Sequence, residues 1–180
     1  MSAARPTLHV LTSAVLELEA FVNEDGWDQP PRLFALALAR DLIEREPDLA
    51  EAMGLGPQLA ESQELIPVEQ EWAPDDTGVD DALAHIAWPE EVVGVAIALE
   101  RILLPPEAEA DLDDDGELSS LVDQAMGHPA KREVRIAVAV MRDGRETSAI
   151  RLRENDADDE VLTGQNLVPG MIDALAATLS

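Results

Sequence analysis

Hydrophobic residues recur at helical spacing near both ends of the chain. The first set predicts a helix that ends near Asp25-Gly26, because glycine commonly follows a helix C-terminus; its members are Leu8, Leu11, Val15, Leu18 and Val22. The second set predicts a final amphipathic helix with Pro169 in its first turn; its members are Val168, Met171, Ile172, Leu175 and Leu179.

Three segments between these helices are predicted to be strands. Arg32–Ala39 and Val92–Leu104 are apolar without a clear alternation, so a helix over Arg32–Arg40 or Val92–Leu104 is the alternative. Their length and flanking prolines favour strands. Glu64–Trp72 contains Pro67, which cannot donate to a central ladder, and is therefore predicted to be an edge strand.

Three further helices are predicted in the interior of the chain. One spans Asp41–Met53, with an interruption before Pro47. A short one runs from Asp80 or Asp81 to Trp88, where Pro89 closes it. A third covers Leu118–Met126, after an acidic stretch.

Glu133–Arg153 is predicted to form a β-hairpin, and its register follows from the turn. A two-residue Asp143-Gly144 loop would place charged residues opposite apolar ones. A three-residue loop, Arg142-Asp143-Gly144 with Gly144 left-handed, shifts the pairing by one residue and turns each side chain toward a different partner. The apolar residues then face each other: Val134, Ile136 and Val138 lie across from Leu152, Ile150 and Ser148.

The same register has an electrostatic consequence on the second face of the hairpin. Arg135 lies directly opposite Arg151, which is unfavourable without an intervening anion, while Glu133 pairs with Arg153. Three explanations are open for the arginine pair. Acidic side chains of the same chain could neutralise it, it could bind an anion or an acidic partner, or it could contact an acidic loop in a dimer.

These elements predict one α+β domain over residues 1–180. A mainly antiparallel sheet of about five strands would be covered by the first and last helices. The helix and strand order resembles that of secretion-chaperone-like domains, which bind other proteins and often dimerise; this is an analogy of fold.

Composition narrows the classes of function. The chain carries 38 acidic and 12 basic residues, a formal net charge of −26, yet the balance reverses between Lys131 and Arg153. A negative field and an aromatic content of 3% argue against nucleic-acid binding. The absence of cysteine excludes disulfides and thiolate metal sites. No apolar run is long enough to span a bilayer, and a cytoplasmic protein without a membrane association is expected.

Candidate chemistry is sparse. Asp111–Gly116 resembles the start of a calcium-binding loop, but Val122 stands where the bidentate glutamate belongs. His9, His85 and His128 have no metal-ligand spacing, and no nucleophile elbow or phosphate loop is found, so no catalytic residue, metal or cofactor is predicted. The remaining candidates are an anion or partner contact at Arg135, Arg151 and Arg153, and an aromatic pocket formed by Trp27 and Trp88.

Six short segments together form a recognisable pattern. They are GWDQPPRLFAL (26–36), PVEQE (67–71), IAWPEEVVG (86–94), LPPEAE (104–109), LTG (162–164) and LVPG (167–170). Through these segments the chain resembles an uncharacterised family of acidic, cytoplasmic actinobacterial proteins of about 180 residues. The resemblance covers nearly the whole chain and implies no activity, cofactor or catalytic residue.

The sequence therefore favours a non-catalytic protein-binding module that forms a homodimer, with a protein partner whose identity is unknown. The alternative is a small-ligand binder, or an enzyme acting on an anionic metabolite, that uses the face with Arg135 and Arg151.

Overall fold

The computed structural model describes residues 8–56, 64–72, 78–90, 92–103, 132–155, 157 and 161–179. Several predicted features lie outside the described residues: the calcium-like loop Asp111–Gly116, the helix over Leu118–Met126, and His128.

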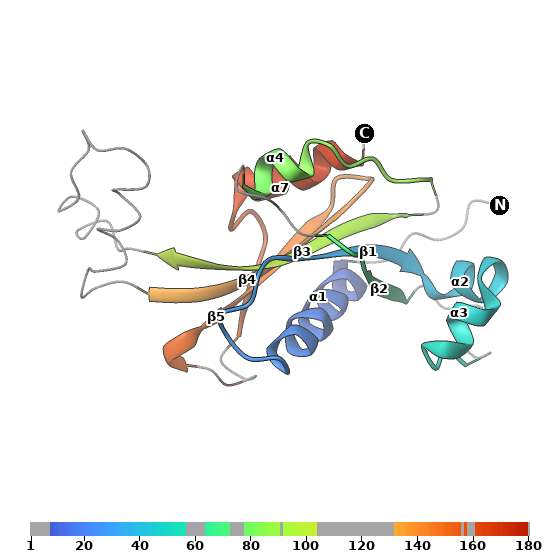
Figure 1. The fold of residues 1–180 in the computed structure, drawn as a ribbon, viewed down its shortest axis with the longest axis horizontal. Coiled ribbons are helices and arrows are strands. Elements are labelled where there is room, and N and C mark those ends of the chain that lie inside the picture. Colours follow the sequence, from blue (N-terminus) through green and yellow to red (C-terminus); the bar gives the residue numbers. More distant parts are fainter. Residues whose placement is uncertain are drawn as a thin grey trace.

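The described chain forms an α+β fold around an antiparallel sheet, as the sequence predicts (Figure 1). The sheet order is β2-β1-β3-β4-β5-β6. Six strands are described rather than about five, because the predicted set lacks the short strand over Leu162–Gly164. The strands are β1 (Arg32–Leu38), β2 (Leu65–Glu69), β3 (Gly94–Leu103), β4 (Arg132–Met141), β5 (Glu146–Leu152) and β6 (Leu162–Gly164).

Helices cover both faces of this sheet. Helix α1 lies against one face, and α4 and α7 lie against the other, while α2 and α3 follow the end of β1 (Figure 1). The helices are α1 (Leu8–Asn23), α2 (Ala39–Arg45), α3 (Pro47–Ala52), α4 (Val79–Leu83) and α7 (Pro169–Thr178), with a short 3-10 helix, η2 (Arg153–Asn155). The predicted break before Pro47 is confirmed, whereas the predicted helix to Trp88 ends at Leu83.

Two apolar cores, one on each face, explain the strands that lack alternation. Val134, Ile136, Val138 and Val140 of β4 point to the core under α7, and the alternate residues of β4 point to α1. The central strand β3 is buried in the same way, with Ala96 in one core and Ile97 in the other. A strand covered on both faces reads as a continuous apolar run. The strand assignment is confirmed for Arg32–Leu38 and Gly94–Leu103, whereas Ala39 and Arg40 begin helix α2.

The hairpin of β4 and β5 has the predicted register. Val134 pairs with Leu152, Ile136 with Ile150 and Val138 with Ser148. The three-residue loop closes where the Met141 amide donates to the Arg145 carbonyl at 2.8 Å. Gly144 has a φ of 92°, the left-handed conformation that the loop requires.

The edge strand β2 exposes a proline on its outer side. The Gln70 amide donates to the Leu33 carbonyl, and the Ala39 amide donates to the Glu64 carbonyl, so the even-numbered residues of this segment face β1. Pro67 therefore faces away from the sheet, where its missing N–H interrupts the free edge. The predicted edge position of this strand is confirmed.

Candidate functional site

A buried ion cluster joins α1 to the hairpin. Arg135 and Arg151 are paired across β4 and β5, as predicted, and Glu19 of α1 forms an ion pair with each of them. The Arg151 guanidinium donates to both carboxylate oxygens of Glu19, with the shortest distance 2.6 Å, and Arg135 Nη1 lies 3.5 Å from Glu19 Oε2. All three residues are only 1% exposed.

Local sequence explains how a glutamate reaches this position. Position 19 follows Val15 by four residues and precedes Val22 by three, so it belongs to the apolar stripe of α1. The stripe packs on the small residues Ala137, Ala139 and Ala149, which let the helix approach the sheet closely. Sequence reasoning missed Glu19 as a site residue. The signal that could have found it is a single carboxylate within an otherwise apolar helix face.

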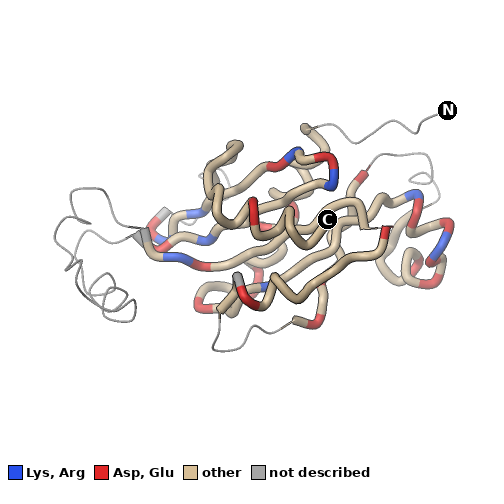
Figure 2. The backbone as a smooth tube through the Cα atoms, turned by 90° about the horizontal axis from the view of Figure 1, so that it is seen from above, with Lys and Arg blue, Asp and Glu red and all other residues tan. Residues whose placement is uncertain are grey.

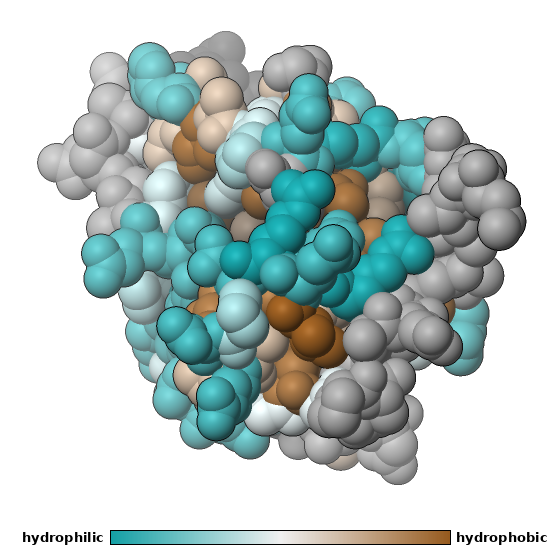
Figure 3. All heavy atoms as spheres, turned by 90° about the vertical axis from the view of Figure 1, so that its right-hand side faces the viewer, coloured by the Kyte–Doolittle hydropathy of each residue, from teal (hydrophilic) through white to brown (hydrophobic). Residues whose placement is uncertain are grey.

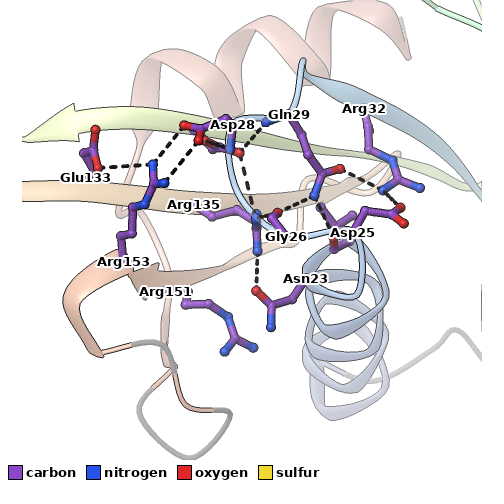
Figure 4. Close-up of polar contacts among 12 residues, drawn as sticks. Asn23, Asp25, Gly26, Asp28, Gln29, Arg32, Glu133, Arg135, Arg151 and Arg153 are labelled. Atoms are coloured by element: carbon purple, nitrogen blue, oxygen red, sulfur yellow. Dashed lines mark hydrogen bonds and ion pairs between the residues drawn. The ribbon is translucent and has the colours of Figure 1, made fainter.

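A second layer of contacts surrounds Arg135 (Figure 4). Its guanidinium donates to Asn23 Oδ1 at 2.7 Å and to the Gly26 carbonyl, and it lies 4.4 Å from the centre of the Trp27 ring. A Glu100 carboxylate oxygen lies 3.8 Å from Arg135 Nη2. The same carboxylate accepts hydrogen bonds from the backbone amides of Asp28 and Gln29. The connector between α1 and β1 is thereby fixed to the cluster.

The outer layer of the cluster is solvent-exposed. Arg153 contacts Asp28 at 2.8 Å and Glu133 at 3.3 Å, so the predicted pairing of Glu133 with Arg153 is confirmed (Figure 4). Hydrogen bonds and the positive charge of Arg153 lower the pKa of Asp28 below its usual value. The hydrogen bonds that Arg153 donates to the Asp28 carboxylate likewise raise the pKa of Arg153. Trp27 lies 5.5 Å beneath the Arg153 guanidinium.

The arginine pair is neutralised within the chain. Of the three explanations that the sequence left open, the structure shows the first, because Glu19 occupies the space that an external anion would need. Two further arginines of the hairpin are also engaged: Arg145 pairs with Asp143, and Arg142 donates to four backbone carbonyls. Those carbonyls belong to the segment before β3 and to Leu179 after α7.

The structure does not bring the two candidate tryptophans together. Trp27 lies on the α1 face of the sheet, next to Arg135. Trp88 packs in the core under α7, where its indole N–H donates to Thr178 Oγ1 at 3.0 Å. The sheet separates the two rings, so they line no common pocket.

Metal and membrane features can be judged for the described residues alone. His9 lies on α1 and His85 follows α4. In the described part of the chain, no group of three or more His, Cys, Asp or Glu residues could hold a metal ion. Among the described helices, none has both the length and the apolar character needed to cross a membrane.

The described chain carries an apolar groove on its surface. It has a volume of about 430 Å³ and lies between the C-terminal half of α1, helix α3, the edge strand β2 and its neighbour β1. Three of its large side chains are exposed to solvent: Phe21 (49%), Leu49 (39%) and Met53 (37%). Figure 3 views the molecule from the side of α2 and α3 and shows hydrophobic surface between hydrophilic side chains. The other residues that line the groove are Glu17, Leu18, Phe34, Pro67, Val68 and Glu69.

Sequence reasoning did not predict this groove. Its residues come from four segments, and each segment shows only an ordinary apolar pattern. The signal that could have found one wall is Phe21, which lies outside the buried stripe of α1.

Comparison with known proteins identifies the family of the chain. No curated protein and no solved structure gives a significant match. The family model described as PPA1309-like protein matches residues 11–180, which include every described helix and strand apart from the first residues of α1. The predicted resemblance to an uncharacterised family is consistent with this match. The chain belongs to the PPA1309-like protein family.

Proposed function

We propose that the protein is a non-catalytic protein-binding module, and that its partner binds in the apolar groove between α1, α3 and β2. One observation carries this proposal: the exposed side chains of Phe21, Leu49 and Met53 surround a single open hollow. Exposed apolar residues are common singly, but a contiguous group around a concavity is typical of an interaction site.

The composition of the groove suits a protein partner. Fully burying a large apolar side chain contributes roughly 1.5–3 kcal/mol, and these three side chains are one third to one half exposed in the free protein. Covering all three would give a useful part of the binding free energy. Met53 adds adaptability, because its unbranched thioether side chain can fill irregular gaps.

The alternative proposal is a small anionic ligand bound at Arg135 and Arg151. It has less support, because both arginines are 1% exposed, Glu19 already accepts hydrogen bonds from Arg151, and Glu19 forms an ion pair with Arg135. A ligand would have to displace a buried carboxylate. Thermal denaturation in millimolar phosphate tests this alternative, since a ligand that binds only the native protein raises its melting temperature.

A pair of matched variants on one helix tests the protein-binding proposal. Phe21→Ser changes the groove. Leu8→Ser removes an exposed apolar side chain of similar accessibility, 37%, at the other end of α1. The two positions are about 20 Å apart at 1.5 Å per residue. The tagged proteins would be used to capture partners from native cell extract, and the captured proteins would be quantified by mass spectrometry.

We expect at least one protein to be retained by the wild type and by Leu8→Ser but to be lost by Phe21→Ser. If the three captured sets are the same, the groove is not the binding surface and the proposal fails. Met53→Ser gives an independent test from the opposite wall.

We also propose that the protein is cytoplasmic, following its composition and family resemblance, and that it forms a homodimer through a surface other than the groove, following the fold analogy with secretion-chaperone-like domains. The hairpin charges give this part no support, because Arg135, Arg142, Arg145, Arg151 and Arg153 contact groups of their own chain. Light scattering after gel filtration tests it, and a monomer at all concentrations would exclude it.

A further inference from the structure

We infer that the segment recognised by the groove is an amphipathic helix flanked by Lys or Arg residues. This inference rests on the proposed function and names the chemistry of the partner. Three observations carry it: the interrupted strand edge beside the groove, the half-open shape of the groove, and the negative charge around it.

The strand edge makes addition of a partner strand unfavourable. An extended peptide binds a sheet edge through alternating backbone hydrogen bonds. In β2 the outward-facing positions are Leu65, Pro67 and Glu69, and the central one has no N–H to donate. A strand of five residues thus offers two outward donors with a gap between them. Pro67 also lines the groove, so the same residue that blunts the edge contributes apolar surface to the hollow.

The shape of the groove favours a helix over a small molecule. Small-ligand sites enclose roughly 70–90% of the ligand surface. Here the walls are themselves 37–49% exposed at Phe21, Leu49 and Met53, so a small ligand would be covered on one side only. A helix can bind to a surface that covers only one of its sides. It inserts its apolar face, with anchors at i, i+3 or i+4 and i+7, and leaves its polar face in water.

The negative charge around the groove favours a helix that carries basic residues. The chain has a formal net charge of −26, and Glu17 lies exposed on the α1 wall of the groove. The opposite wall belongs to the α2–α3 segment, which can be followed in Figure 2. That segment carries more exposed acidic than basic side chains: Glu44, Glu46, Asp48 and Glu51 against Arg45.

Arg32, which lies beside Phe21 of the groove, does not reverse the negative charge around it. Arg32 lies 5.2 Å from the centre of the Phe21 ring, but it is paired with Asp25 at 2.8 Å and with Glu69 at 2.7 Å. The two carboxylates outnumber the guanidinium. A second copy of the chain is disfavoured as the occupant because it would bring the same large negative charge, and anionic lipid is disfavoured for the same reason.

The test uses fluorescent synthetic peptides and measures binding by anisotropy. The probe is a peptide of Leu, Ala and Lys, with Leu at i, i+3, i+4 and i+7. One control peptide has the same composition in strict alternation, the pattern of a strand. A second keeps the helical pattern with Glu in place of Lys. Three proteins are compared: the wild type, Phe21→Ser, and Leu8→Ser as the matched control.

We expect the basic helical peptide to bind the wild type and Leu8→Ser more tightly than either control peptide. Phe21→Ser should weaken this binding about tenfold or more, since burial of a large aromatic side chain is lost. Glu17→Lys, which changes an exposed charge and leaves the apolar walls intact, should weaken it severalfold. The effect of Glu17→Lys should shrink at high salt, where exposed charges are screened.

Several results would overturn the inference. One is equal or tighter binding of the alternating or the acidic peptide, and another is equal binding of the basic peptide by Phe21→Ser and the wild type. Urea denaturation tests whether Phe21→Ser is folded. If it is not folded, the affinity of Glu17→Lys for the basic helical peptide tests the inference instead.

The peptide and capture experiments separate the two proposals. If native partners depend on Phe21 but the basic helical peptide does not bind, the protein-binding function stands and the helix inference is wrong. If neither depends on Phe21, both are wrong. If gel filtration with light scattering shows a dimer that Phe21→Ser abolishes, the occupant is a second copy of the chain and the inference is also wrong.

Discussion

Replacing Glu19 with glutamine should destabilise the protein strongly. The change keeps the shape of the side chain but removes the charge that neutralises Arg135 and Arg151, both 1% exposed and directly opposite each other. At the 3.5 Å between Arg135 Nη1 and Glu19 Oε2, Coulomb attraction is about 5 kcal/mol with an effective dielectric constant of 20. Measured losses from breaking a buried ion pair are about 3–5 kcal/mol, and we expect a loss in this range.

Urea denaturation followed by circular dichroism measures this loss. With a denaturant slope of about 2 kcal/mol per molar urea, the midpoint should fall by roughly 1.5–2.5 M. Glu17→Gln is the matched control, because the same substitution two residues away on α1 affects an exposed side chain. It should change the free energy of unfolding by less than about 0.5 kcal/mol.

Two further results test the reasoning behind the number. A variant that replaces all three charged residues, Glu19→Leu with Arg135→Met and Arg151→Met, should recover most of the stability, since no uncompensated charge stays buried. Phosphate should stabilise Glu19→Ala but not the wild type, because only the truncated side chain leaves an unoccupied space beside the two guanidinium groups. A loss below about 1 kcal/mol for Glu19→Gln would refute the assignment of Glu19 as their counterion.

Three other substitutions probe the fold. Arg142→Ala should lower the free energy of unfolding by about 1–3 kcal/mol, because four carbonyls lose a charged donor. Arg145→Ala in the same turn should lower it by less than about 1 kcal/mol, and equal losses for the two variants in urea titrations would contradict this difference. Gly94→Ala should cost about 1–3 kcal/mol, because its Cβ would lie 2.8 Å from a backbone carbonyl oxygen of β4; an unchanged melting temperature would show that the strands can separate freely. Arg153→Gln should raise the pKa of Asp28 toward 3.8, as followed by an NMR titration of the Asp28 carboxyl carbon, and an unchanged titration would show that another group lowers this pKa. The contribution of Asp28 to stability is present above its unfolded pKa and is lost as the pH falls through its lowered folded pKa.

The hairpin shows how far local pattern reaches. Its register follows from two local facts: an Asp-Gly pair favours a tight turn, and a slip of one residue would set charges against the apolar face. Both facts are present in the sequence, so the pairing of Arg135 with Arg151 and of Glu133 with Arg153 was predictable. The sixth strand was not, because three residues of Leu162–Gly164 are too few to show a period.

The sequence by itself determined several local features of this protein: its helical stripes, its apolar strands, the break at Pro47 and the turn at Gly144. These depend on interactions between residues close in the chain. The tertiary structure alone decided that Glu19 neutralises residues more than 100 positions away, that Trp27 and Trp88 lie on opposite faces of the sheet, and that four segments enclose a groove around Phe21. The physical reason is that packing, not periodicity, selects which helix covers which face, and charges and exposed side chains acquire their partners only when those faces meet.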